Sequence, residues 1–321
     1  MRASSGHPAE SAAGEPPAGE RPEQHSEDLG AALRRATAVL AEAGVPSPRA
    51  DAELLAEHLL GCGLGRLRAL AVLGAPVPEG FWDLVDERAK RVPLQHLTGT
   101  AHFRHLALSV GPGVFVPRPE TETLVTLVLD WIVGQKGLAQ PVVVDLGTGS
   151  GAIAASIAAE CPSSRVHAVE LSELAHAWAA RNVSLPEVGG RVELVLGDLR
   201  TAFPELNGAV DVVVSNPPYI PEGMVPREPE AAEHDPDLAL YGGGEEGLDV
   251  PRAAIASAAR LLRPGGFFAM EHAEVQADYL SARLAADPAW TGVASHRDLN
   301  GLPRATTAVR SSRPRVEELG P

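Results

Sequence analysis

The sequence predicts an α/β protein in which a small helical bundle precedes a doubly wound, mostly parallel sheet. From residue 141 onward, apolar runs that suit buried strands alternate with stretches that suit helices, as in a parallel sheet covered on both faces. Before residue 92, apolar residues instead recur at helical spacing between glycine and proline breaks. The chain has 321 residues, 45% of them hydrophobic, which is enough for a core in each part.

The helical part consists of short helices separated by turn residues. The first helix should end near Gly44, and Ser47 should cap a second helix that has Pro48 at its first position. A further helix follows Pro78. No side chain here suggests chemistry, so we interpret the bundle as a module for packing or for docking a partner. The residues expected to face its core are Leu29, Leu33, Ala36, Leu40, Phe81, Leu84 and Val85.

Residues 97 to 116 change to short alternating segments, HFRHLALSV and GVFVP, which indicate a hairpin between the two parts. The expected strands are PVVVDL, RVHAVEL, VELVL, VDVVVSN and GGFFAMEH, followed by a last pair near 291 to 310. Helices are expected in AIAASIAAE, ELAHAWAARN and 252 to 263, with a long polar loop before the last of these. The segments we assign are a disordered acidic tail (1–28), the helical bundle (29–91), the linker hairpin (92–116), the α/β domain (117–310) and a C-terminal tail (311–321).

Composition argues against several classes of protein. The first 28 residues have no apolar period and do not resemble a signal peptide, and no stretch approaches about 18 apolar residues. We therefore expect a cytoplasmic protein without membrane contact, acting as a monomer. The net charge of −15 argues against a long nonspecific nucleic-acid footprint, although it leaves room for a local basic groove. Cys62 and Cys161 are expected to be separate thiols, and no metal site is predicted; His102 and His105 come nearest to ligand spacing.

A glycine-rich turn, VVVDLGTGSGAIA, lies between the first strand of the sheet and its helix. Gly147, Gly149 and Gly151 let backbone N–H groups and the helix N-terminus approach a ligand closely. Glu170 ends the next strand, where a carboxylate can accept hydrogen bonds from both hydroxyls of a ribose. The turn and the carboxylate together predict a nucleoside cofactor.

The turn does not decide which nucleoside binds. Its first two glycines and Ala152 also satisfy the dinucleotide pattern G-x-G-x-x-G/A, so NAD stays an alternative. We favour S-adenosylmethionine because Asp145 precedes a short GTGSG turn and because nothing in the chain suggests a hydride-acceptor site. The third strand ends in Asp198 and Leu199, which can bind the adenine amino group and pack on its ring.

The fourth strand, VVVSNPPYIP, ends in an unusual way for a buried strand. Asn216 lies at the carboxyl edge of the sheet, on the same side as the glycine turn, where parallel sheets bind ligands. Its side-chain oxygen can accept from an NH2 group, and the stiff Pro217-Pro218 backbone offers carbonyl acceptors without N–H groups. Tyr219 can stack on a planar group. These four residues predict a site that holds a planar NH2 group, with its lone pair toward a methyl sulfonium and no strong base required.

The N-P-P-Y sequence resembles the motif of methyltransferases that modify planar amino groups, including adenine-N6 DNA enzymes and protein-glutamine N5 enzymes. Two longer segments resemble the second group. Residues 93 to 125, PLQHLTGTAHFRHLALSVGPGVFVPRPETETLV, are similar to the linker region of release factor glutamine methyltransferases, and P-R-P-E-T-E is highly specific to that family. Residues 238 to 255, LALYGGGEEGLDVPRAAI, resemble the family's segment after N-P-P-Y. The likeness extends from the helical part to about residue 310.

The resemblance implies a class I, seven-stranded methyltransferase domain that transfers a methyl group from S-adenosylmethionine to the glutamine of the Gly-Gly-Gln motif in class I peptide release factors. The bundle would position that protein substrate. The departures concern the pocket: His96 replaces a tyrosine, Glu170 an aspartate, and EHAEVQ around Glu271 lacks a glycine. By position, the cofactor contacts would be Gly147, Thr148, Gly149, Ser150, Gly151, Glu170, Leu199 and Asn216, the glutamine site Asn216, Pro217, Pro218 and Tyr219, and the wall over the pocket Arg118, Pro119, Glu120, Thr121 and Glu122.

Two other functions stay open. An adenine-N6 DNA or RNA methyltransferase would use the same motif, but it needs a target-recognition region and a basic track for phosphates. The loop from 220 to 248 is instead acidic, which suits either a solvated loop or a surface facing a basic protein, and we expect no nucleic-acid substrate. A non-catalytic docking protein is the other alternative, which calorimetry with the cofactor would test. The acidic residues of the loop are Glu222, Glu228, Glu230, Glu233, Asp235, Asp237, Glu245 and Glu246.

Overall fold

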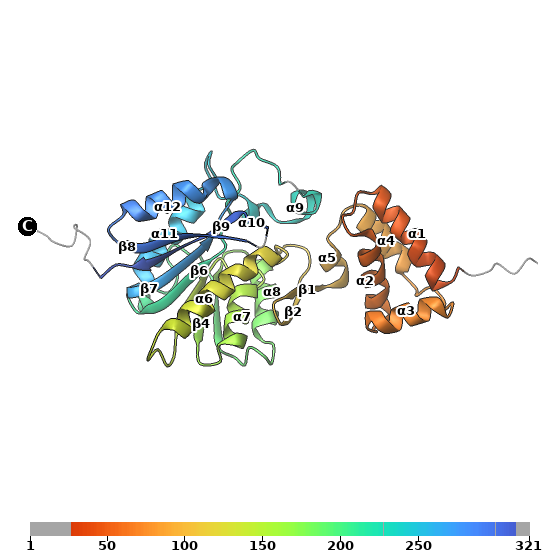
Figure 1. Cartoon of the computed structure of the whole chain (residues 1–321), viewed down its shortest axis with the longest axis horizontal. Coiled ribbons are helices and arrows are strands. Elements are labelled where there is room, and N and C mark those ends of the chain that lie inside the picture. Colours follow the sequence, from red (N-terminus) through yellow and green to blue (C-terminus); the bar gives the residue numbers. More distant parts are fainter. Residues whose placement is uncertain (1–26, 227, 299, 313–321) are drawn as a thin grey trace, which may run out of the picture.

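The chain folds as a helical bundle followed by an α/β domain, with a hairpin between them (Figure 1). This computed structural model describes residues 27–226, 228–298 and 300–312, so the acidic tail and the C-terminal tail fall almost wholly outside the described residues. The predicted fold class, a doubly wound α/β sheet preceded by a helical bundle, is confirmed. Across the described residues, no helix has the length and apolar character needed to span a bilayer.

One apolar cluster holds the bundle together. Leu29, Leu40, Leu55, Leu67 and Phe81 are fully buried or nearly so within it, and most of the residues around them recur at helical spacing. The fifth helix falls in the segment assigned to the linker, yet its leucines pack against this same cluster. The helices are α1 (Leu29–Glu42), α2 (Pro48–Leu60), α3 (Leu64–Val72), α4 (Phe81–Ala89) and α5 (Leu94–Thr98).

Two helix starts in the bundle differ from expectation. Asp28, which we assigned to the tail, is the N-cap of α1, because its side chain accepts a 2.8 Å hydrogen bond from the backbone nitrogen of Ala31. Ser47 is the N-cap residue of α2 as predicted, but its side chain makes no capping hydrogen bond. Ser47 has ψ of 58°, outside the extended conformation in which a cap residue aims its oxygen at the free N–H groups of the first turn. Pro48 does begin the helix as predicted.

The hairpin after the bundle packs against the α/β domain. Strands β1 (Thr100–Phe103) and β2 (Leu106–Ser109) pair antiparallel, so the hairpin lies within the HFRHLALSV segment, and GVFVP forms no strand. Phe103 and Leu108 are buried in the same core cluster as the helices on one face of the sheet. The hairpin is therefore part of the α/β domain's packing.

The large sheet has seven strands in the order β5-β4-β3-β6-β7-β9-β8. The five neighbouring strands β5, β4, β3, β6 and β7 run parallel, whereas β9 is antiparallel to both β7 and β8. Strands β3 and β6 are parallel neighbours, and the order of the strands reverses between them. The glycine turn after β3 and the N-P-P-Y segment after β6 therefore lie side by side at the carboxyl edge of the sheet. The strands are β3 (Val142–Leu146), β4 (Arg165–Glu170), β5 (Val192–Leu196), β6 (Val210–Ser215), β7 (Leu262–Glu271), β8 (Trp290–Arg297) and β9 (Pro303–Arg310).

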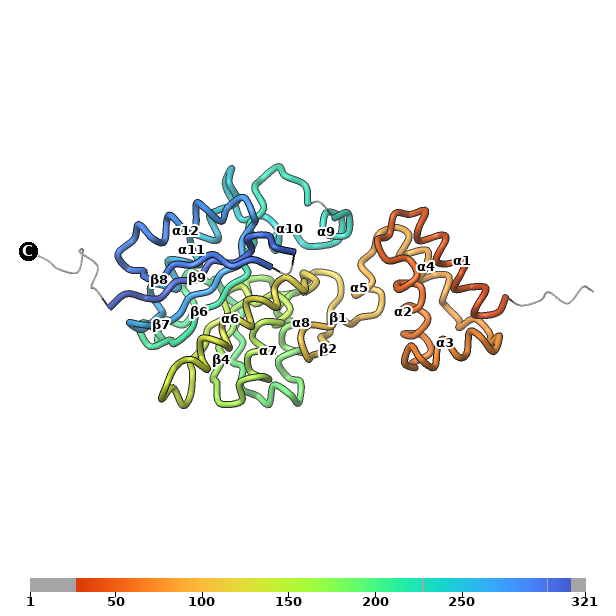
Figure 2. Tube along the Cα trace, viewed as in Figure 1, coloured from red at the N-terminus to blue at the C-terminus, as the bar shows by residue number. Residues whose placement is uncertain are grey.

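Helices cover both faces of this sheet, and Figure 2 shows α6 and α7 on one side with α11 and α12 on the other. Each face has its own apolar core, and the valines of β3 and β6 contribute to both because these strands are buried on both sides. The helices are α6 (Glu122–Gly134), α7 (Ala152–Glu160), α8 (Glu173–Val183), α9 (Pro229–His234), α10 (Asp237–Leu240), α11 (Asp249–Leu261) and α12 (Ala277–Ala286), with single 3-10 turns η1 (Pro119–Thr121), η2 (Pro204–Leu206) and η3 (Glu274–Gln276).

Candidate active site

A cavity of about 500 Å³ opens at the carboxyl edge of the sheet, next to the reversal of strand order between β3 and β6. It brings together the glycine turn, the end of β4, the end of β5 and the N-P-P-Y segment, as the sequence predicts. Arg118, Glu120 and Thr121 also line it, whereas Pro119 and Glu122 do not. The predicted site residues that line the cavity are Gly147, Thr148, Gly149, Ser150, Glu170, Asp198, Leu199, Asn216, Pro217, Pro218 and Tyr219.

The glycine turn needs glycine for two different reasons. Gly147 and Gly149 have positive φ of 76° and 58°, and a Cβ at either would meet nothing within 4 Å. Gly151 also has positive φ, but a Cβ there would lie 3.4 Å from Ala179 of α8. The first two positions therefore leave space where a ligand can approach the backbone. Gly151 instead lets α7 and α8 pack closely, and its predicted cofactor contact stays a prediction.

Asp145, which is buried near the end of β3, stabilises this turn and does not line the cavity. Its Oδ2 accepts hydrogen bonds from the hydroxyl of Thr148 at 2.6 Å and from the backbone nitrogen of Ala154 at 3.2 Å. Complete burial raises the pKa of Asp145 to about 7, against the opposing effect of these two bonds. The residue that we used to favour S-adenosylmethionine therefore acts by shaping the turn.

Glu170 lies where a ribose-binding carboxylate is expected. Its Oε2 accepts from the backbone nitrogen of Gly149 and its Oε1 from that of Ser172, both at 2.8 Å, so the carboxylate is oriented between the glycine turn and α8. Burial raises its pKa, although these backbone bonds oppose the shift. Each oxygen has a further lone pair for a hydroxyl group. The carboxylate of Glu170 and the open face of the turn thus fit the ribose and the amino-acid chain of a nucleoside cofactor. The carboxylate of Asp198, at the end of β5, forms an ion pair with Arg200 at 3.1 Å.

Replacing Glu170 by alanine is expected to weaken S-adenosylmethionine binding by about 10- to 100-fold. A hydrogen bond to a charged group contributes about 1.5–3 kcal/mol, and the substitution removes the ribose acceptors. Calorimetric titration of the wild-type and variant proteins measures this change. Glu173→Ala, an exposed carboxylate in the first turn of α8 that does not line the cavity, is the matched control. Unchanged affinity in Glu170→Ala, or tighter binding of NAD, would contradict the assignment.

The N-P-P-Y segment is held rigidly from behind. Side-chain nitrogen Nε2 of Gln276 donates at 2.9 Å both to the carbonyl of Tyr219 and to that of Glu246. Gly242 and Gly247 allow the following loop to pass closely, because a Cβ at these positions would lie 2.7 Å from the carbonyl oxygen of Pro218 and 2.3 Å from that of Tyr219. The glycines of the LALYGGGEEGLDV segment thus serve to fix the backbone of the motif.

Asn216 is oriented so that its oxygen is the atom available to a ligand. Its Nδ2 donates to the hydroxyl oxygen of Thr121 at 3.2 Å, which occupies the nitrogen end of the carboxamide. Thr121 comes from the P-R-P-E-T-E segment, so that segment directly supports the motif. The Oδ1 of Asn216 and the carbonyl of Pro217 are then two acceptors on one stiff backbone turn.

Glu271, the last residue of β7, is a part of the site that we singled out only for its missing neighbouring glycine. It lines the cavity, and its Oε2 is buried without a hydrogen-bond partner among the described residues. Burial raises its pKa to about 7, although the hydroxyl of Thr121, the charge of Arg304 and the amide of Asn216 oppose the shift. Burial and Glu271 also raise the pKa of Tyr219, which keeps its hydroxyl protonated. The position of Glu271 at a strand end beside β6 was the available signal.

The acidic loop is not simply a solvated loop or a surface for a basic partner. Glu230 forms ion pairs with Arg88 and Arg91 of the bundle, and Asp235 pairs with Arg118. Both interpretations are therefore wrong for these residues, because arginines far away in the sequence neutralise them. The loop also contains two short helices, α9 and α10.

Comparison with known proteins gives matches along both parts of the chain. Residues 31–99 match the family described as "PrmC N-terminal domain" and residues 106–226 the family described as "Methyltransferase small domain". A relative from Streptomyces coelicolor, named "Release factor glutamine methyltransferase", is 51% identical over 88% of this chain and 98% of its own. One of the same name from Mycolicibacterium smegmatis is 48% identical over 89% of this chain and 99% of its own.

A relative with a different name is also similar over most of its length. The "4-amino-L-phenylalanine/4-methylamino-L-phenylalanine methyltransferase" of Streptomyces pristinaespiralis is 41% identical over 88% of this chain and 95% of its own. Among solved structures, the N-terminal domain of human METTL16 in complex with SAH is 18% identical, with a TM-score of 0.47, over 75% of this chain and 86% of that one. The identity and coverage of the first two relatives decide the family. The chain belongs to the release factor glutamine methyltransferase family.

Proposed function

We propose that this chain methylates the side-chain amide nitrogen, N5, of the glutamine in the Gly-Gly-Gln motif of class I peptide chain release factors, as a cytoplasmic monomer. The observation that supports this most is the pair of acceptors formed by Asn216 and Pro217 in a rigid turn at the cavity. S-adenosylmethionine supplies the methyl group when it is bound. Glu170, the glycine turn, Asp198 and Leu199 are the residues that would hold it.

The chain's own residues address the main difficulty of this reaction. An amide nitrogen is a weak nucleophile because its lone pair is delocalised into the carbonyl. Two acceptors that hold both N–H bonds can keep the lone pair directed at the methyl carbon, and they bind more strongly as positive charge develops on nitrogen. One of the two N–H protons then leaves to water, so that the product is a neutral secondary amide. The stiffness of the motif, fixed by Gln276 and the close glycines, means that little reorganisation is needed at that moment.

The same acceptors would also suit other planar amino groups, so the substrate needs direct comparison. Adenine in a nucleic acid offers such a group, and so does the arylamine in the name of the Streptomyces pristinaespiralis relative. The net charge of −15 disfavours a polyanion. The P-R-P-E-T-E segment, which places Thr121 against Asn216, favours the glutamine substrate through the resemblance already described.

Incubation with methyl-labelled cofactor should place label in a class I release factor, on the glutamine of its Gly-Gly-Gln motif. The parallel substrates are a Gln→Ala variant of that release factor, adenine-containing DNA and RNA, and 4-amino-L-phenylalanine. Mass spectrometry of the digested protein locates the methyl group. Undiminished label in the Gln→Ala protein, or faster transfer to a nucleic acid or to the arylamine, would exclude glutamine as the main substrate.

A further inference from the structure

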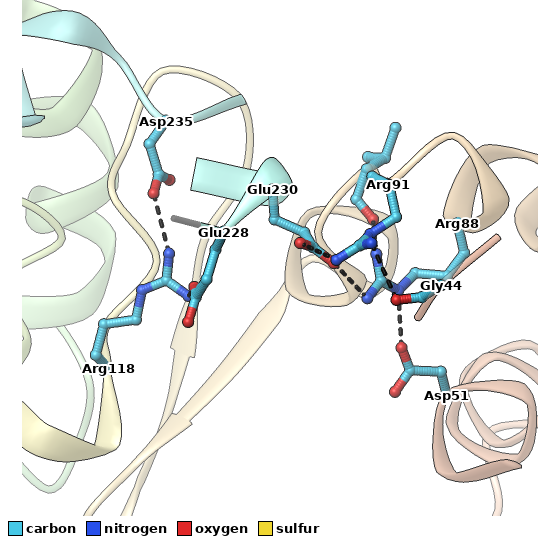
Figure 3. Close-up of polar contacts among 9 residues, drawn as sticks. Gly44, Asp51, Arg88, Arg91, Arg118, Glu228, Glu230 and Asp235 are labelled. Carbon is cyan, nitrogen blue, oxygen red and sulfur yellow. Dashed lines mark hydrogen bonds and ion pairs between the residues drawn. The ribbon is translucent and has the colours of Figure 1, made fainter. Parts of the chain in front are cut away.

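Helix α9 lies between the bundle and the α/β domain, and ion pairs hold it on both sides (Figure 3). Toward the bundle, Glu230 accepts hydrogen bonds of 2.8 and 2.6 Å from Arg91 and one of 2.8 Å from Arg88. Toward the α/β domain, Arg118 pairs with Glu228 at 3.0 Å and with Asp235 at 3.2 Å. A helix of six residues is too short to be stable by itself, so these contacts determine where it lies.

Both arginines also make hydrogen bonds within the bundle, which orient their side chains toward Glu230. Arg88 donates to the carboxylate of Asp51 on α2 at 2.7 Å, and Arg91 donates to the carbonyl of Gly44 at 3.0 Å. Two carboxylates therefore balance two guanidinium groups, which lets the cluster be buried: the side chain of Arg88 is 6% exposed and that of Glu230 13%. The cluster therefore connects the bundle to α9 in one defined arrangement of hydrogen bonds.

The carboxylate of Glu230 stays charged under any ordinary condition. Burial acts to raise its pKa, but hydrogen bonds from Arg91 and Arg88 outweigh burial and lower the pKa to about 2. The arginines are charged as well, so the three groups attract one another throughout the physiological range of pH.

The segment that carries Glu230 also forms one wall of the cavity. Ala231 on α9, together with Pro236 and Leu240 further along, lines the cavity, and so does Arg118 on the other side of the helix. A displacement of α9 would therefore change both the orientation of the bundle and the shape of the site where N-P-P-Y receives its substrate.

We propose that Glu230 is a positioning residue that fixes the bundle relative to the cavity through Arg88 and Arg91. A release factor that contacts both parts then presents its glutamine in register with Asn216, because the two contact surfaces are held at one separation. This inference rests on the proposed function, since it requires a protein substrate large enough to touch both parts.

Glu230→Gln keeps the shape of the side chain and removes its charge. The KM for the release factor should rise about tenfold or more, because the bundle is no longer held at the separation that lets both contact surfaces bind the release factor together. The kcat and the affinity for S-adenosylmethionine should change little, because Arg118 still holds α9 on the side of the cavity. The melting temperature should fall, because the buried guanidinium of Arg88 loses one of its two carboxylates. Glu233→Gln, an equal change of charge on the exposed side of the same helix, is the matched control.

Arg91→Gln tests the pairing directly. It should raise KM in the same direction as Glu230→Gln, which also removes the pairing with Arg88. The double variant should be no worse than Glu230→Gln alone, because the Arg91–Glu230 interaction is already lost in that variant. Additive effects, or a fall in kcat at unchanged KM, would overturn the proposal.

A measurement without substrate separates this inference from the proposed function. The free thiols of Cys62, after α2, and Cys161, after α7, allow one spin label in each part of the full-length chain. Pulsed electron resonance should give one narrow distance distribution in the wild type and in Glu233→Gln, and a broad one in Glu230→Gln. Absence of release-factor methylation would refute only the proposed function. An unchanged distribution in Glu230→Gln would overturn the positioning role.

Discussion

Alanine in place of Asn216 is expected to lower turnover of the release factor by about 10²–10³, the effect of losing one preorganised hydrogen bond to a developing charge. Positive charge forms on the amide nitrogen during methyl transfer, and Oδ1 of Asn216 is the side-chain acceptor available to its N–H group. Steady-state kinetics at saturating substrates measure the change in kcat. Cofactor affinity should fall as well, because the family pattern assigns this side chain to both ligands.

The matched control for this variant is Asn300→Ala, an exposed carboxamide in a turn that does not line the cavity. Its turnover should equal that of the wild type. If Asn216→Ala keeps full turnover while remaining folded, another group holds the substrate amide and the assigned role of the motif is wrong.

The sheet and the cavity edge could be predicted because local signals coincide there with the tertiary structure. Runs such as VVVS are buried on both faces in the sheet, so their composition reports their environment directly. Gly147 and Gly149 need positive φ at the turn, which is visible as glycine in the sequence. The end of one strand and the end of its neighbour then meet because the sheet is parallel.

The missed features depend on partners that are distant in the sequence. Glu230 belongs to a segment that looked like a solvated loop, and only the fold brings Arg88 and Arg91 to it. Ser47 had the right residue type for a cap but the wrong backbone conformation. Glu271 is the last residue of a buried strand and gives no sign that Thr121, from the P-R-P-E-T-E segment, lies against it. Side-chain networks of this kind carry no periodic signal.

Glutamine in place of Glu271 is the second substitution from which we expect a large effect, a fall in turnover of about 10². The hydroxyl of Thr121 favours the ionised carboxylate of Glu271, which can only accept hydrogen bonds, and the hydroxyl oxygen of Thr121 accepts from Nδ2 of Asn216. A glutamine amide offers a donor at the same place, which allows Thr121 to turn and Asn216 to present its nitrogen. The substrate NH2 group would then face a donor.

The dependence of kcat on pH distinguishes this role of Glu271 from simple misfolding of the variant. Burial raises the pKa of Glu271 to about 7. Since the ionised form is the one that orients Thr121 and Asn216, kcat of the wild type should rise as the pH increases through about 7. This rise of kcat with pH should be absent in Glu271→Gln.

Stability should change in the opposite direction from turnover. Because the folded pKa exceeds the ordinary value of 4.5, the stabilisation from the protonated form is full below pH 4.5 and is lost as the pH rises to about 7. Glu271→Gln avoids that loss, so its melting temperature should exceed that of the wild type at pH 8 and approach it at pH 5. Asp278→Asn, an exposed carboxylate on α12, should change neither quantity. A variant that is both slower and less stable at pH 8 would show that Glu271 serves packing and does not orient Asn216.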